Sequence, residues 1–194
     1  MNDKFALLDA SDSVLLVIDV QDPFLHKVGT PIANRVVERI QWLVVLARWM
    51  EIPVVVTAED ISVCGLTTEP IRKVLPDDAS DQDKLVFGLT GQEDIFQSVV
   101  ATDRKTAVIV GLETDVCIQH SAMGLASRGY NVAVVVDATA SPGIGHEIGI
   151  GRMREAGITL VSTKSLFFEW VRDLDTGCRF FSESDLKAPP DLYI

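Results

Sequence analysis

Cysteine and histidine are scarce in this chain of 194 residues, and their scarcity limits the chemistry that it can carry. The three cysteines, Cys64, Cys117 and Cys178, are an odd number at unrelated spacings. They fit neither a disulfide framework nor a zinc site of the Cys-x-x-Cys type. The three histidines also lack the mutual spacing of metal ligands. We therefore expect a reduced, cytoplasmic protein with no metal and no other cofactor.

Basic charge and long apolar runs are also lacking. Lys and Arg number 17 against 28 Asp and Glu, so the net charge is −11. Because an acidic surface repels phosphates and anionic lipids, we expect neither nucleic acid nor membrane as a partner. No apolar run reaches the roughly 18 residues of a membrane span, and the opening segment "MNDKFALLDASD" has no signal-peptide core. The G-x-G-x-x-G of dinucleotide-binding loops is missing too, which disfavours a nucleotide-binding protein.

Apolar runs that alternate with amphipathic stretches are present along most of the chain. The runs at residues 13–20, 52–58 and 106–111 are typical of strands buried on both faces. Residues 32–50 carry apolar side chains at helical spacing. Strands that alternate with helices predict a single α/β domain over residues 1–194, with a parallel sheet between two layers of helices.

Three local patterns give finer predictions. The segment "KLVFG", residues 84–88, predicts a short strand that opens with Lys84. Thr90 and Glu93 have the spacing of a capping box at the start of a helix. Ser141, which is followed by a proline, predicts the N-cap of a later helix.

Cys117 follows the fourth predicted strand and opens a predicted helix. Helix N-termini stabilise a thiolate, and their N–H groups can hold an oxyanion. A carboxylate such as Asp19, at the end of the first strand, can take the thiol proton, and a cation such as Lys84 can stabilise the resulting charge. A lone cysteine is otherwise often a buried core residue. Glu59 and Asp60, after the second strand, could contact a substrate, but a solvated loop fits them better.

Three segments of the chain resemble the isochorismatase-like cysteine hydrolases, the superfamily of isochorismatases and nicotinamidases. They are "LLVIDVQDPF", "DKLVFGLTGQEDIF" and "VIVGLETDVCIQHSAMGLASRGYNVAVVVDA", and the last contains Gly-x-x-Thr-x-x-Cys ending at Cys117. The resemblance implies a Rossmann-like sheet of six parallel strands. It also implies a catalytic triad of Asp19, Lys84 and Cys117. Lys73, which lies in the same region of the sequence, is the alternative to Lys84 as the lysine of this triad.

The resemblance further implies how such a site works. Cys117 would attack a carbonyl or imine carbon, and Asp19 would accept the thiol proton and pass it to the leaving group. The backbone N–H groups of Glu113 and Cys117 would form an oxyanion hole, next to a cis peptide between Leu112 and Glu113. The implied activity is hydrolysis of a small C–N bond (amide, ureide or imide-like) through a thioester-like intermediate.

The chain departs from the nicotinamidases after the second strand. Those enzymes have an Asp and two His there that bind a metal, whereas this chain has "TAEDISVCGLTTEP". The resemblance therefore does not extend to a metal or to nicotinamide as substrate. Gln21 and Phe24 are candidates for the substrate pocket, and a homo-oligomer, dimer or tetramer, is the family expectation. The alternative is a binding or regulatory protein that keeps this fold without turnover.

Overall fold

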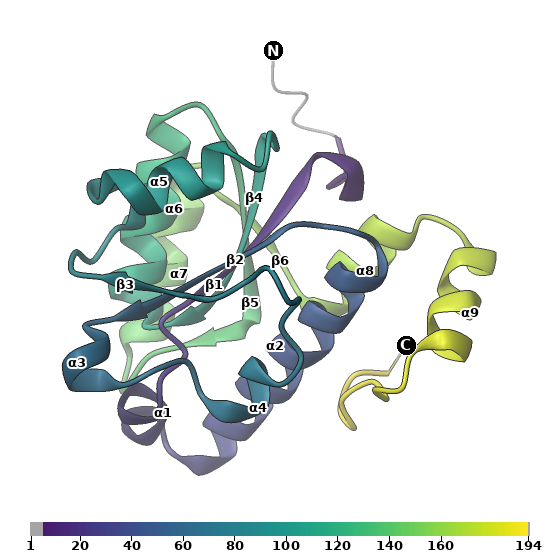
Figure 1. Ribbon diagram of the computed structural model, residues 1–194, viewed down its shortest axis with the longest axis horizontal. Coiled ribbons are helices and arrows are strands. Elements are labelled where there is room, and N and C mark those ends of the chain that lie inside the picture. Colours follow the sequence, from purple (N-terminus) through teal and green to yellow (C-terminus); the bar gives the residue numbers. More distant parts are fainter. Residues whose placement is uncertain (1–5, 194) are drawn as a thin grey trace.

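A six-stranded sheet runs through the middle of the computed structural model, which describes residues 6–193 (Figure 1). The strands lie in the order β3-β2-β1-β4-β5-β6, and every neighbouring pair is parallel. They are β1 (Ser13–Ile18), β2 (Val54–Glu59), β3 (Asp81–Lys84), β4 (Thr106–Leu112), β5 (Asn131–Ala140) and β6 (Thr159–Val161). The predicted α/β fold with six parallel strands is confirmed.

Helices cover both faces of the sheet. On one face lie α2 and α8, and on the other lie α5, α6 and α7 (Figure 1). The helices are α1 (Asp22–Val28), α2 (Thr30–Trp49), α3 (Ile61–Cys64), α4 (Glu69–Arg72), α5 (Glu93–Val100), α6 (Gln119–Ser127), α7 (Gly145–Glu155), α8 (Thr163–Val171) and α9 (Leu174–Glu183). Within residues 6–193, none of them has the length and apolar character that a bilayer crossing requires.

The central strand β1 shows why the apolar runs form buried strands. Its side chains alternate between the two faces, so that Leu15 and Val17 join the core beneath α2 while Leu16 and Ile18 join the core beneath α5, α6 and α7. All six residues of β1 are buried. Each fully buried Leu, Ile or Val stabilises the fold by about 1.5–3 kcal/mol. Continuous apolar character is what a strand needs when helices pack on both sides of it.

The third strand differs from its prediction. Residues 84–88 do not form it; β3 is Asp81–Lys84, so Lys84 closes the strand instead of opening it. This strand lies at the edge of the sheet and pairs only with β2, so polar residues suffice for it. The apolar side chains that suggested a strand, Leu85 and Phe87, are exposed beyond its end.

Both predicted helix starts are also wrong. α5 begins at Glu93 with Gln92 at the N-cap, because Thr90 lies within a short 3₁₀ turn, Leu89–Gly91. α7 begins at Gly145, because the hydroxyl of Ser141 donates to the Asp115 carboxylate at 2.6 Å and caps no helix. In each case a segment that is not α-helical replaces the predicted first helical turn.

At two glycines of α7, Gly149 and Gly151, substitution by alanine should have opposite effects on stability. A Cβ on Gly149 would lie 2.9 Å from the backbone of Asp115, whereas a Cβ on Gly151 would meet nothing within 4 Å. Gly149→Ala should lower the free energy of unfolding by about 1–3 kcal/mol, because the helix must move away from the backbone of Asp115. Gly151→Ala should raise it by roughly 0.5–1 kcal/mol, because alanine loses less backbone entropy in a helix. Urea denaturation measures both, and equal effects would contradict the close packing at Gly149.

Candidate active site

Four neighbouring strands bring reactive side chains to the same edge of the sheet. Asp19 follows β1, Glu59 ends β2, Lys84 ends β3 and Cys117 follows β4. Glu59 and Lys84 are direct partners in the ladder between β2 and β3. Because all of these strands are parallel, their carboxyl ends converge, which is where sites form in this type of sheet.

The nucleophile candidate Cys117 lies in a tight turn between β4 and α6. This turn, Thr114–Ile118, is a single π-helical turn, and the thiol is only 4% exposed. The peptide bond between Leu112 and Glu113 is cis. Just before it, Gly111 has a φ of +126°, and a Cβ there would lie 1.9 Å from the carbonyl oxygen of Ile18. Only glycine fits where β4 passes so close to β1.

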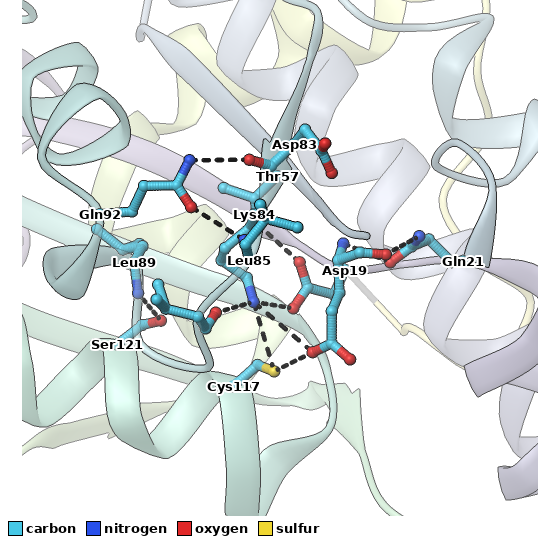
Figure 2. Close-up of polar contacts among 12 residues, drawn as sticks. Asp19, Gln21, Thr57, Asp83, Lys84, Leu85, Leu89, Gln92, Cys117 and Ser121 are labelled. Carbon is cyan, nitrogen blue, oxygen red and sulfur yellow. Dashed lines mark hydrogen bonds and ion pairs between the residues drawn. The ribbon is translucent and has the colours of Figure 1, made fainter. Parts of the chain in front are cut away.

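Lys84 is the centre of the polar cluster, and it is completely buried. Its ammonium lies 2.9 Å from Asp19 Oδ2, donates to the carbonyl oxygen of Val86 at 2.6 Å and lies 3.7 Å from Cys117 Sγ (Figure 2). Burial disfavours the charged form, but Asp19 and the other groups around the ammonium outweigh that effect and raise the pKa of Lys84. Lys84 is therefore a cation held between a carboxylate and the thiol.

The rival lysine is elsewhere. Lys73 is 68% exposed and pairs with Glu69 along α4. Its ion pair is of the surface type, which contributes little to stability. The structure therefore places Lys84, and not Lys73, beside Cys117 and Asp19.

Asp19 is a buried carboxylate with fixed partners. Its Oδ1 accepts a hydrogen bond from the Thr57 hydroxyl at 2.9 Å, and its Oδ2 faces Lys84. Its φ of +52° is in the left-handed region, which is uncommon for a residue other than glycine. Burial raises the pKa of Asp19 and outweighs the opposite effect of Lys84. A carboxylate with a raised pKa is a better proton acceptor than an ordinary surface aspartate.

The resting state of Cys117 differs from the thiolate that the sequence predicted. Burial raises the pKa of the Cys117 thiol, and the charge of Asp19 adds to that effect, so that Lys84 only partly offsets them. The thiol instead donates to Glu59 Oε2 at 3.2 Å. The cysteine is therefore a neutral thiol at rest and must transfer its proton when it attacks.

This raised pKa predicts a shifted reactivity profile for Cys117. At a given pH a smaller fraction of the thiol is ionised, so alkylation by iodoacetamide should be slower than for a free thiol with the ordinary pKa of 9.0. The rate at Cys117 should still be rising above pH 9, because the thiolate is not yet fully formed there. Alkylation can be followed by mass spectrometry of the Cys117 peptide against pH. A rate that reaches its plateau below pH 8 would contradict the neutral thiol.

Glu59 is the residue that the sequence predictions undervalued, because they preferred a solvated loop to substrate contact for it. Its carboxylate lies 3.2 Å from Cys117 Sγ and 3.8 Å from Lys84 Nζ, and its side chain is 25% exposed. Its place at the end of the buried strand β2, next to the strand that leads to Asp19, is the signal that could have found it. The paired register of Glu59 and Lys84 could not be seen without the sheet.

A small pocket of about 130 Å³ opens in front of the sulfur. Its lining residues are Phe24, Lys27, Glu59, Phe87, Leu112, Glu113, Val116 and Cys117. Phe24 lines this pocket and also packs against the hydrophobic core, so its contact with substrate stays a prediction. Gln21 is not among the lining residues, because its buried side-chain amide is used elsewhere. Its NH₂ group donates to the carbonyl oxygens of Glu59 and Gly65, and its oxygen accepts from the Glu59 N–H. Gln21 positions Glu59 and does not face the pocket.

The same cluster offers ligands for a metal ion. Ligand atoms of Asp19, Glu59 and Cys117 all lie within 4.8 Å of one another. The ammonium of Lys84 stands among them and is bound to Asp19, so an incoming cation would meet a fixed positive charge. This donor set therefore suits a proton-transfer site better than a metal centre, and the absence of a metal stays a prediction.

Comparisons with known proteins agree with this fold. The isochorismatase domain model matches residues 13–165. The secreted isochorismatase effector Isc1 of Phytophthora sojae is 32% identical over 83% of this chain and 78% of its own length. The chain therefore belongs to the isochorismatase family.

Solved structures show the same fold. The MAR1 ribonuclease of Caenorhabditis elegans has a TM-score of 0.85 at 24% identity, covering 96% of both chains. YcaC of Pseudomonas aeruginosa, solved with hexane-2,5-diol and covalent acrylamide, has a TM-score of 0.81 at 25% identity over 87% of this chain and 85% of its own. YcaC of Escherichia coli, described as an octameric hydrolase of unknown specificity, has a TM-score of 0.81 at 24% identity over 92% of this chain and 90% of its own.

Proposed function

We propose that the protein is a cysteine hydrolase that cleaves the C–N bond of small amide, ureide or imide-like molecules. The observation that carries this proposal is the buried Lys84, which contacts Asp19 at 2.9 Å and Cys117 at 3.7 Å at the base of a pocket. Membership of a family of hydrolases supports it. A buried cation beside a carboxylate and a thiol is expensive to maintain, and catalysis is a reason to keep it.

The reaction follows from the positions of these groups. The Cys117 thiol, which donates to Glu59 at rest, gives its proton to Asp19, which has a carboxylate oxygen within 4.8 Å of the sulfur, while sulfur forms a bond to the substrate carbon. The N–H groups of Glu113 and Cys117 are proposed to hold the oxyanion. Asp19 then gives the proton to the nitrogen as the C–N bond breaks, which releases an amine or ammonia. Water cleaves the remaining thioester and restores the thiol. Throughout these steps Lys84 stays protonated and stabilises the negative charge on sulfur during the attack and on Asp19 before it takes the proton and after it gives the proton away.

The relatives bear on this proposal in two ways. One YcaC structure contains covalent acrylamide, which adds to nucleophiles through its alkene, so it supports a reactive nucleophile in that relative and not amide cleavage. Another relative is described as a ribonuclease. Two observations disfavour RNA as a substrate of this protein. The net charge of −11 repels a phosphate backbone, and the pocket of about 130 Å³ is smaller than the roughly 300–1,000 Å³ of pockets for drug-sized ligands. Assembly into a homo-oligomer is also proposed, and the description of one relative as octameric supports it.

A panel of small amides and ureides tests the proposed function. Wild-type protein should release amine or ammonia from at least one member, and rapid quenching should show the substrate's acyl mass on the Cys117 peptide. Dialysis against a strong chelator should leave the rate unchanged. Loss of activity that zinc or iron restores would instead require a metal. Absence of both turnover and adduct across the panel would favour a binding or regulatory protein that keeps the fold.

A further inference from the structure

The charges that line the pocket are not balanced. Three charged side chains border it, namely Lys27, Glu59 and Glu113. Lys27 lies 3.2 Å from Glu113 and 4.6 Å from the centre of the Phe24 ring, so its charge is already compensated at the entrance. Glu59 shares its cation with Asp19, because the Lys84 ammonium lies 3.8 Å from Glu59 and only 2.9 Å from Asp19.

The space next to the sulfur is therefore negative. When the thiol is neutral and both carboxylates are ionised, Asp19, Glu59 and Lys84 together carry one net negative charge. Of the two carboxylates, only Glu59 lines the pocket, whereas Asp19 is buried behind it. A substrate carbon that contacts Sγ must come close to the Glu59 carboxylate, which lies 3.2 Å from that sulfur. At such distances an anion is repelled and an N–H group finds an acceptor.

We propose that Glu59 makes this site selective for small uncharged or cationic substrates whose nitrogen carries a hydrogen, and that it excludes substrates with a carboxylate beside the scissile bond. The volume of about 130 Å³ limits their size, since an engineered cavity of roughly 150 Å³ holds one benzene molecule. The walls formed by Phe24, Leu112 and Val116 favour a short apolar acyl group. This inference names the substrate class of the proposed hydrolase and rests on that function.

A pair of alkylating reagents tests the selectivity without requiring turnover. Iodoacetamide and iodoacetate have nearly the same size and differ in one negative charge. Each forms a bond from sulfur to carbon and releases iodide, so the rate at each cysteine can be measured by peptide mass spectrometry. The ratio of the two rates cancels the pKa of the thiol when both are measured at the same pH. Cys178, which is exposed on α9, supplies the reference ratio within the same chain.

In the wild type, the iodoacetamide-to-iodoacetate ratio at Cys117 should exceed the ratio at Cys178 by about tenfold or more. Glu59→Gln should reduce the excess roughly tenfold, because it removes the charge and keeps the shape. Asp60→Asn is the matched control: it removes the same charge one residue further along, outside the pocket lining, and should leave the ratio unchanged. Glu59→Ala removes the charge as well, so either variant that folds gives the measurement.

Equal ratios at Cys117 and Cys178 in the wild type would overturn the proposal. So would an excess at Cys117 that survives the loss of the Glu59 charge, because another group would then repel the anion. The amide panel gives a separate result. If the protein turns over no amide, the proposed hydrolase function is refuted, while the ratio of the two alkylation rates still shows whether the pocket rejects anions.

Discussion

Cys117→Ala should lower the turnover of any amide that the panel identifies by about 10⁴-fold or more. Without the sulfur there is no covalent intermediate, and the residues of a catalytic triad act as a unit, so the rest of the site retains little activity. The Asp19–Lys84 pair stays intact in this variant, which separates loss of chemistry from loss of structure. Steady-state rates with wild-type and variant protein measure the effect.

Cys178→Ala provides the control for this prediction. Cys178 is exposed on α9 and lies outside the pocket lining, so its removal should leave the rate unchanged. Circular dichroism and urea denaturation of both variants show whether each is folded. Substantial turnover by folded Cys117→Ala protein would rule out the proposed nucleophile.

Lys84→Met should destabilise the protein by about 3–5 kcal/mol, which is the usual cost of breaking a buried ion pair from one side. The substitution leaves the Asp19 carboxylate buried without its cation. Methionine fills a similar volume, so the loss of stability comes from the missing charge and not from a cavity. Urea denaturation at neutral pH measures the change. Lys73→Met is the matched control, and it should change stability by less than about 0.5 kcal/mol because Lys73 is exposed.

The pH dependence of this loss has a definite sign. In the variant, burial without Lys84 raises the pKa of Asp19 further above its ordinary value of 3.8. The folded variant therefore binds a proton that the unfolded chain does not bind, in the window between 3.8 and the raised pKa. Its stability relative to the wild type should recover as the pH falls into that window. A deficit that stays constant with pH would contradict an unpaired Asp19 as its cause.

The parts of the site that follow buried strands could be predicted from the sequence. Continuous apolar runs mark β1 and β4 because helices pack on both faces of the sheet. Asp19 and Cys117 come directly after these runs, so their positions at the carboxyl ends of the strands follow from the pattern. The role of Lys84 could be predicted only from the resemblance to a family, because the edge strand that ends at Lys84 is polar and has no apolar pattern of its own.

The contributions of Glu59 and Gln21 could not be predicted, since they depend on contacts between distant segments. Glu59 faces Cys117 because the register between β2 and β3 places it beside Lys84. The register of two strands cannot be predicted from the sequence of either strand alone. Gln21 is polar and near Asp19 in sequence, which suggested a pocket residue, yet its amide is used to hold the loop after β2. The neutral thiol was missed for a related reason, because the sequence shows the helix start and not the depth of burial.

The strand order has a consequence for the synthesis of this protein on the ribosome. β1 lies between β2 and β4, and β4 begins roughly 90 residues after β1 ends. At about 5–20 residues per second, the edge of β1 that awaits β4 stays without its partner for roughly 5–20 s. That edge is apolar and unpaired, which is the condition that promotes aggregation. Nascent chains that stop before Leu112 should therefore be insoluble, and chaperones that shield this edge would favour the yield of complete protein.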